Sequence, residues 1–279
     1  MVPAEHTVSL TVRCTDEVSV SRLEARGFRS LVWLEELSIL DCNFRNIPDK
    51  AFLGLTRLKT LNIKSSTLGD LAFSRGSFDG LANLQSLDLS GNRVKFPERG
   101  VLCSLPNLVS LNLSSSELSD LSDLGLTSGV SSLNCVRNVR RLDLSRNSLT
   151  SLTWTGNTSG SSVFSFPSLE KVDLSHNLLR SLSSTSLEWL TASEPVDLDL
   201  SNNRLSSLPP RLLGHAPLRH LSLANNSLTS LPSDLVAGQS GLRVLDLSGN
   251  LLDSPELKPT LFQETPALTQ LYLSDNRFG

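Results

Sequence analysis

A repeat with leucine at fixed positions runs through most of the chain and constrains its fold more than any other feature. The segments 84–94, LQSLDLSGNRV, and 218–228, LRHLSLANNSL, both follow the pattern L-x-x-L-x-L-x-x-N-x-L, with Val94 at the last position of the first. Sliding this template along the sequence gives ten frames with a mean spacing of 26 residues. The frames begin at Leu34, Leu58, Leu84, Leu108, Val139, Leu169, Pro195, Leu218, Leu242 and Leu268. A period of this length indicates stacked coils that each contact only their neighbours.

The repeat predicts an α/β leucine-rich-repeat solenoid, a horseshoe of about ten repeats with a parallel concave β-sheet and an irregular convex side. Each L-x-L core is expected to be a short strand with alternate side chains in the core. Residues 1–33 are expected to be an N-terminal cap and lead-in, because the alternating segment 8–14 can pair with the first repeat. Residues 34–279 are expected to hold ten repeats. The last one would be truncated and uncapped, as in a fragment of a longer array.

The asparagine at the ninth position of each frame is expected to turn inward and bond to the backbone of its own and a neighbouring coil. Leaving one such buried backbone group unpaired would cost about 1–3 kcal/mol. Cys42, Ser66 and Ser116 replace this asparagine in three coils, and Pro195 replaces a leading leucine in another. The expected ladder consists of Asn92, Asn147, Asn177, Asn203, Asn226, Asn250 and Asn276.

The four cysteines show no C-x-x-C spacing, so they do not form a zinc or redox motif. Cys14 ends the cap strand and Cys42 ends the first repeat strand. Cys103 and Cys135 take nearly the same convex position in adjacent coils. We therefore expect disulfides Cys14–Cys42 and Cys103–Cys135, because each pair would be close enough to bridge. The alternative is four free thiols in a cytosolic protein.

Three N-x-S/T sequons begin at Asn112, Asn157 and Asn225. Asn157 is the best glycosylation candidate, because the Gly/Ser/Thr stretch around it predicts a flexible loop. A glycan on Asn112 would cover part of the concave face. Together with the expected disulfides, the sequons favour an oxidising, secreted environment.

Charge and composition exclude several function classes. The chain has 25 Lys and Arg against 28 Asp and Glu, a near-balance that argues against nucleic-acid binding. It has no apolar run of about 18 residues and no signal peptide, which in a fragment says nothing of the whole protein. We find no nucleophile constellation, no metal-ligand spacing and no glycine-rich phosphate loop. The sequence therefore predicts a non-enzymatic protein with no catalytic residues, no metal and no cofactor.

The expected concave face is polar and carries charges of both signs. A column of aspartates between the core leucines could suggest a calcium or basic-ligand site, but L-D-L-S is a common spelling of this repeat. The column contains Asp88, Asp143, Asp173, Asp199 and Asp246. We interpret the face as a surface for protein recognition. The ligand-face candidates are Lys59, Lys64, Arg140, Lys171, Arg219, His220 and Tyr272, with Trp154 in the loop near Asn157.

The chain resembles the N-terminal ectodomain of arthropod Toll receptors and is nearest to their long developmental branch. Four segments carry this resemblance. They are LTVRC at 10–14, LEELSILDC at 34–42, IPDKAFLGLTRL at 47–58, and GVLC at 100–103 followed by LNC at 133–135.

The resemblance implies the extracellular part of a single-pass cell-surface receptor whose cytoplasmic TIR domain is absent here. Such receptors bind Spätzle-like cystine-knot cytokines or cell-surface partners in innate immunity or development, and they signal as dimers. Contact with the membrane would come only through a missing C-terminal segment. The alternatives are an adhesive or matrix leucine-rich-repeat protein and a cytosolic repeat scaffold.

Overall fold

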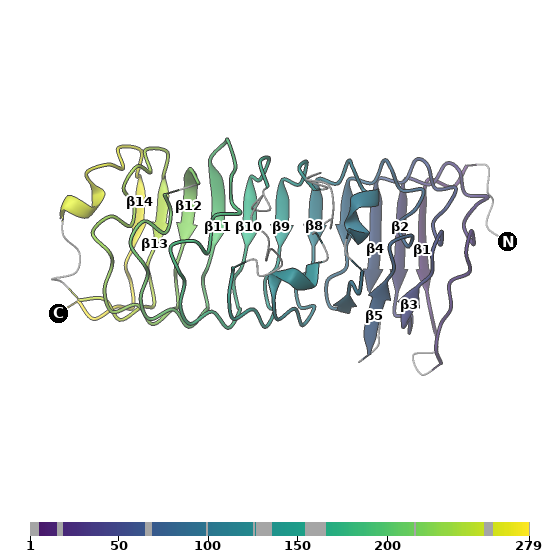
Figure 1. Ribbon diagram of the computed structural model, residues 1–279, viewed down its shortest axis with the longest axis horizontal. Coiled ribbons are helices and arrows are strands. Elements are labelled where there is room, and N and C mark those ends of the chain that lie inside the picture. Colours follow the sequence, from purple (N-terminus) through teal and green to yellow (C-terminus); the bar gives the residue numbers. More distant parts are fainter. Residues whose placement is uncertain are drawn as a thin grey trace. The chain divides into compact units, whose positions relative to one another are not determined.

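The computed structural model describes residues 6–15, 19–64, 69–98, 100–124, 126, 136–153, 166–214, 216–253 and 259–278. The chain divides into two compact units. The first comprises residues 1–118 and 122–141, and the second comprises residues 119–121 and 142–279. In both units a short strand alternates with a longer return segment, and successive strands lie side by side (Figure 1). Each unit is thus a leucine-rich-repeat solenoid with a parallel sheet, as expected.

The main sheet of the first unit is parallel and has the strand order β1-β2-β4-β6-β8. Its strands are β1 (Ser9–Arg13), β2 (Glu36–Leu40), β4 (Thr60–Lys64), β6 (Ser86–Asp88) and β8 (Ser110–Asn112). Strand β1 pairs with β2 along its whole length, with Ser9 opposite Glu36 and Arg13 opposite Leu40. The alternating N-terminal segment therefore does extend the repeat sheet, as its pattern predicts.

A second, three-stranded parallel sheet in the first unit was not expected from the sequence. It contains β3 (Asn46–Ile47), β5 (Asp70–Phe73) and β7 (Arg93–Lys95), in the order β3-β5-β7. These strands bury Ile47, Phe73 and Val94. Strands of two to four residues are too short to show a period-two pattern, which explains why the sequence did not reveal them.

The main sheet of the second unit is also parallel, in the order β10-β11-β12-β13-β14. Its strands are β10 (Lys171–Asp173), β11 (Val196–Asp199), β12 (Leu218–Ser222), β13 (Val244–Asp246) and β14 (Gln270–Tyr272). Strand β9 (Arg141–Asp143) lies in the sequence where the chain passes from one unit to the other.

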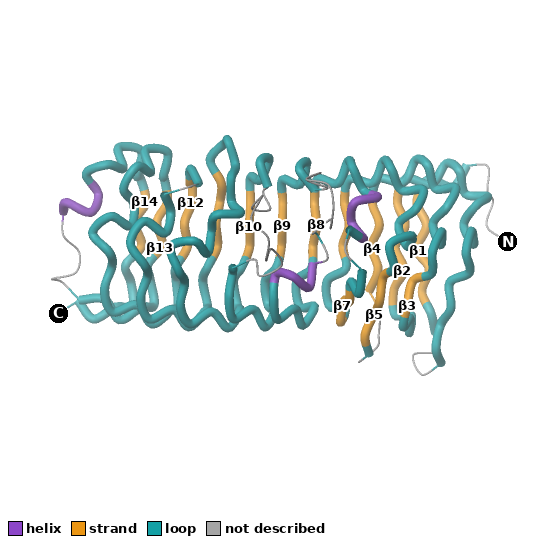
Figure 2. Tube along the Cα trace, in the orientation of Figure 1, coloured by secondary structure: helices purple, strands orange, loops and turns teal. Residues whose placement is uncertain are grey.

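The return segments are irregular, as expected, and consist mainly of loops and turns (Figure 2). They include the short 3-10 helices η1 (Val101–Ser104), η2 (Leu121–Leu124) and η4 (Pro259–Phe262). None of the residues that the structure describes forms an α-helix.

The core of each unit consists of the frame leucines, which stack from coil to coil. The second leucine of the frame is fully buried in β2, β4 and β6, at Leu37, Leu61 and Leu87. On the return side of the first unit, the rings of Phe28 and Phe52 stack with centroids 6.2 Å apart. Burying one such aliphatic or aromatic side chain contributes about 1.5–3 kcal/mol, so the repeated leucines dominate the stability of the fold.

One frame assignment was wrong. Val196, and not Pro195, fills the leading core position of its coil, because Val196 is fully buried and aligns with Leu218. The register shifts between Val196 and Asp197, as in a β-bulge. The bulge shortens the strand side of this coil by one residue, so the fixed template placed the first core residue one position too early.

The eighth position of the frame adopts the left-handed conformation in coil after coil. It has a positive φ at Arg146 (55°), His176 (56°), Asn202 (55°), Asn225 (53°) and Asp275 (56°). Non-glycine residues rarely adopt this conformation. It turns the chain immediately before the ladder asparagine, so the turn that aims the asparagine inward is built into every one of these coils.

Candidate recognition surface

The ladder asparagines join neighbouring coils of the second unit. In Asn226, Nδ2 donates to the carbonyls of Leu200 and Leu223, each at 3.0 Å. The Oδ1 atom of Asn226 accepts from the N–H of Leu205 at 3.0 Å. The same three contacts recur for Asn177, Asn203, Asn250 and Asn276. The ladder therefore holds the strands in register beneath the outward sheet face.

In the first unit the ladder is represented by Asn92 and Ser116. Asn92 donates to the carbonyls of Ile63 and Leu89, each at 2.7 Å. The shorter Ser116 hydroxyl reaches the Leu89 carbonyl only at 3.4 Å. Asn147, the first ladder asparagine of the second unit, donates to the Leu144 carbonyl in its own coil at 2.9 Å. Ser66, another expected exception, lies outside the described residues.

The outward sheet face is the face that carries the residues between the core leucines. Its aspartates have a structural role. Asp173 Oδ1 accepts from the backbone N–H of Ser175 at 3.0 Å and from its hydroxyl at 2.6 Å. Asp143 and Asp246 make the same pair of bonds, and Asp88 and Asp199 make the backbone bond. The L-D-L-S spelling thus closes the turn after each of these five strands, which favours the structural interpretation of this column.

The described residues contain no group of three or more His, Cys, Asp or Glu side chains that could hold a metal ion.

The ligand-face candidates of the first unit are exposed. Lys59 forms an ion pair with Glu35 in the preceding coil, with Nζ 2.7 Å from Oε2. Lys64 is exposed at the end of β4, and Arg140 is exposed just before β9. Because Lys59 already has a counter-charge, a partner would have to compete with Glu35 for it.

The β-bulge in the second unit organises a cluster of charges on the outward sheet face. Arg219 forms a two-point ion pair with Asp197, with Nε–Oδ1 at 2.9 Å and Nη2–Oδ2 at 2.6 Å. The hydrogen bonds to Asp197, followed by its charge, raise the pKa of Arg219 above its ordinary value. Lys171 and His220 lie opposite Asp197 on the two adjacent strands. The structure thus brings together three of the candidates around one carboxylate.

The remaining candidates are separate from this cluster. Tyr272 in β14 is 48% exposed, and its hydroxyl lies 3.2 Å from Gln270 Oε1. Trp154 lies outside the described residues, as does Asn157. Of the other sequons, Asn112 is half-buried on the outward sheet face, with its Oδ1 accepting from Ser114. Asn225 is exposed.

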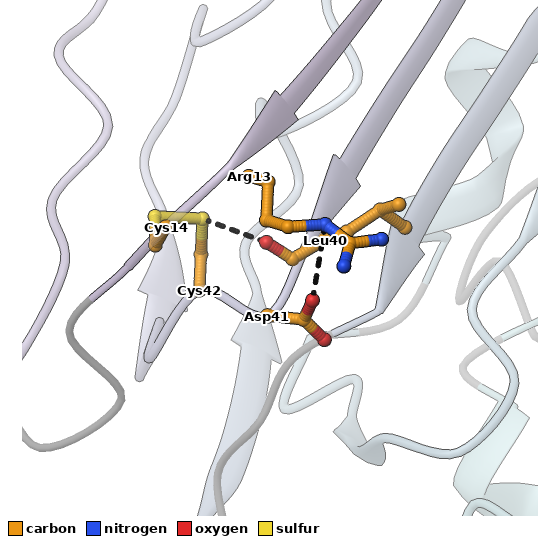
Figure 3. Close-up of polar contacts among 5 residues, drawn as sticks. All are labelled: Arg13, Cys14, Leu40, Asp41 and Cys42. Atoms are coloured by element: carbon orange, nitrogen blue, oxygen red, sulfur yellow. Dashed lines mark hydrogen bonds and ion pairs between the residues drawn. A yellow bond between two sulfur atoms is a disulfide. The ribbon is translucent and has the colours of Figure 1, made fainter.

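The N-terminal strands are joined by a disulfide between Cys14 and Cys42. Figure 3 shows this disulfide beside the ion pair of Arg13 and Asp41, whose Nε and Oδ2 atoms are 3.4 Å apart. Both contacts join β1 to the end of β2. Cys103 is disulfide-bonded as well. Its expected partner, Cys135, lies outside the described residues.

Two further sets of hydrogen bonds between coils were not predicted from the sequence. The residue just before the frame is Asn83, Asn107 or Asn138 in three coils of the first unit, and each donates to a carbonyl of the preceding coil at 2.8 Å. In the second unit, buried Gln239 accepts from the N–H of Leu218 and donates to two carbonyls. The signal for the first set was an asparagine directly before the frame, in the spellings LANL at 81–84, LPNL at 105–108 and VRNV at 136–139.

None of the helices in the described part of the chain has the length and apolar character needed to cross a bilayer.

Family comparisons agree with the repeat geometry. The sequence-family model "Leucine rich repeat" matches residues 33–94 and 216–278. A family model of two leucine-rich repeats matches residues 82–126. A third repeat model matches residues 196–216. The chain belongs to the leucine-rich-repeat proteins.

Within this class, the chain is similar to Toll-like receptors and to Tsukushi. It is 33% identical to Tsukushi of Gallus gallus over 215 residues, which cover 68% of this chain and 54% of that protein. It is 32% identical to Toll-like receptor 7 of Drosophila melanogaster over 200 residues, which cover 68% of this chain and 13% of the receptor. The chain thus spans about half of the first relative and a small part of the second.

Among solved structures, the glycosylated Toll–Spätzle complex matches with a TM-score of 0.70 and 22% identity, over 97% of this chain and 37% of that one. This likeness concerns the fold. The relatives come from vertebrates as well as an insect, so they support a wider Toll-like group and not the arthropod developmental branch in particular.

Proposed function

We propose that this chain is a protein-recognition part of a Toll-like receptor ectodomain and that it binds a protein ligand through its outward sheet face. The ligand would be a Spätzle-like cystine-knot cytokine or a cell-surface protein, and the receptor would act as a dimer. The charge cluster of Lys171, Asp197, Arg219 and His220 carries this proposal. The core and the ladder do not require these side chains, so they are available to a partner.

The cluster suits recognition for a physical reason. Arg219 is held in one orientation by its two bonds to Asp197, so it loses little conformational freedom when a partner binds. β-Bulges often re-aim side chains at functional positions, and the register between β11 and β12 shifts just before Asp197. The Cys14–Cys42 disulfide supports an extracellular setting, because such bonds persist in oxidising compartments.

Surface plasmon resonance with a purified Spätzle-like cytokine tests the proposal. We expect the double variant Lys171→Glu/Arg219→Glu to weaken binding at least tenfold. The matched control is Arg180→Glu/Arg204→Glu, which makes the same change of charge at exposed residues outside the strands of the same unit. Equal loss in both variants would show that net charge, and not the cluster, determines binding.

A second candidate is an adhesive or matrix protein, favoured by the match to Tsukushi, which covers a larger share of that relative than of the receptor. Fractionation of cells that express the full-length transcript separates the two. A receptor would stay with the membrane fraction through a span outside this sequence, whereas a matrix protein would be found in the medium.

A further inference from the structure

A small exposed apolar area lies at the N-terminal coils of the first unit. Val8 is 51% exposed, Val32 46% and Trp33 44%. The backbone of Val8 lies against the segment that follows Trp33, because its carbonyl accepts hydrogen bonds from the backbone N–H groups of Glu35 and Glu36. We call Val8, Val32, Trp33 and Arg57 the Trp33 patch.

Arg57 contributes a positive charge to this patch. Its guanidinium carbon lies 3.7 Å from the centroid of the Trp33 ring, which is a cation–π contact. Arg57 is exposed and makes no ion pair with any carboxylate among the described residues. A guanidinium over a ring keeps N–H groups at its edge, and these can bind a carboxylate at two points. The neighbouring charges of Lys59 and Glu35 neutralise each other.

At the position just before the frame, the coils of the Trp33 patch differ from later coils of the same unit. In three later coils of the unit, the residue just before the frame is an asparagine that donates to the preceding coil. In the first two frames this residue is Trp33 and then Arg57. Trp33 is 44% exposed, so the solenoid leaves much of its side chain open to a partner. Such departures from local rules are expected at functional positions.

We infer that the Trp33 patch binds an acidic, partly apolar segment of a partner protein. Trp33 and the two valines contact an aliphatic or aromatic side chain of the partner, and Arg57 binds an adjacent Asp or Glu carboxylate. Tryptophan and arginine are enriched among the residues that contribute most to protein–protein affinity. Their mutual contact orders both side chains before binding. This inference rests on the proposed function and adds a docking point distinct from the outward sheet face.

Selection from a random peptide library tests this inference and requires no named partner. Phage-displayed peptides of 12 residues are selected on the full chain and counter-selected on the variant Trp33→Ala/Arg57→Ala. We expect enriched peptides with Asp or Glu beside Leu, Ile or Phe. Affinity for the synthetic peptides should fall at least tenfold with either single substitution.

A charge exchange separates a direct contact from a folding effect. Arg57→Glu should abolish binding of the acidic peptides, and replacing the peptide's acid by Lys should restore binding to Arg57→Glu. The matched control is Arg45→Glu, which makes the same change at an exposed residue of the return side. Retention of the Cys14–Cys42 disulfide and an unchanged circular dichroism spectrum would verify the fold of each variant.

The inference is overturned if enriched peptides lack acidic residues, if they bind equally to Arg57→Glu, or if no peptide depends on Trp33. Peptides that lose binding only with Lys171→Glu/Arg219→Glu would also overturn it, but they would support recognition by the outward sheet face. The cytokine measurement tests the proposed function separately, so the two failures are distinguishable.

Discussion

Removing one ladder side chain tests whether asparagine bonds between coils stabilise the second unit. In the variant Asn226→Ala, the N–H of Leu205 loses the Oδ1 acceptor that lies 3.0 Å away. The carbonyls of Leu200 and Leu223 each lose one donor. Each still accepts from a neighbouring ladder asparagine, Asn203 at 3.1 Å for Leu200 and Asn250 at 2.9 Å for Leu223.

The expected loss follows from these contacts. An orphaned buried N–H costs about 1–3 kcal/mol, and each hydrogen bond lost from a carbonyl that keeps another donor costs about 0.5–1 kcal/mol. We therefore expect Asn226→Ala to lower the free energy of unfolding by about 3 kcal/mol. Asn276→Ala removes the same kinds of bonds from a part-exposed site. Water can replace them there, so we expect a loss of about 1 kcal/mol.

Urea unfolding followed by circular dichroism measures both variants, and hydrogen exchange at the Leu205 amide reports the local effect. Asn226 bonds to its own coil and to the preceding one, so the loss of protection should be largest in these two coils. Losses that are equal in the two variants within about 0.5 kcal/mol would refute the reasoning, because burial is the main difference between the two sites.

Three further predictions concern other parts of the chain. Gln239→Leu should lower the free energy of unfolding by about 2–4 kcal/mol in urea, although leucine suits a core, because three backbone groups each lose a hydrogen bond and, among the described residues, only the Leu213 carbonyl keeps another donor, the N–H of Ala216. Cys14→Ser/Cys42→Ser should cost roughly 3–4 kcal/mol in the first unit, since the disulfide closes a 28-residue separation in the unfolded chain; a loss under about 1 kcal/mol would contradict this. A double-mutant cycle on Arg219 and Asp197 should give a coupling below about 1 kcal/mol, because their side chains are 47% and 29% exposed; a larger value would mean that the pair is structural.

The repeat, its core and most of the ladder could be predicted from the amino-acid sequence. A solenoid coil contacts only the coils beside it, so the spacing of Leu and Asn along the chain specifies the contacts almost completely. The pairing of Cys14 with Cys42 followed from the same frame, because both residues end adjacent strands. The Toll-like resemblance was supported at the level of the wider group, whereas the recognition residues remain predictions.

Which exposed side chains meet could be learned only from the folded chain. Trp33 and Arg57 come from adjacent coils, directly before the frames of Leu34 and Leu58. Their contact depends on how these two coils stack on each other. Asp197 meets Arg219 where the register between β11 and β12 shifts by one residue, an offset that the fixed template did not detect. At core positions the strands of neighbouring coils must stay in one register, because a shift would expose side chains that the fold buries. Surface positions have no such constraint, so only the folded coils show which charges are paired and which, like that of Arg57, have no counter-charge among the described residues.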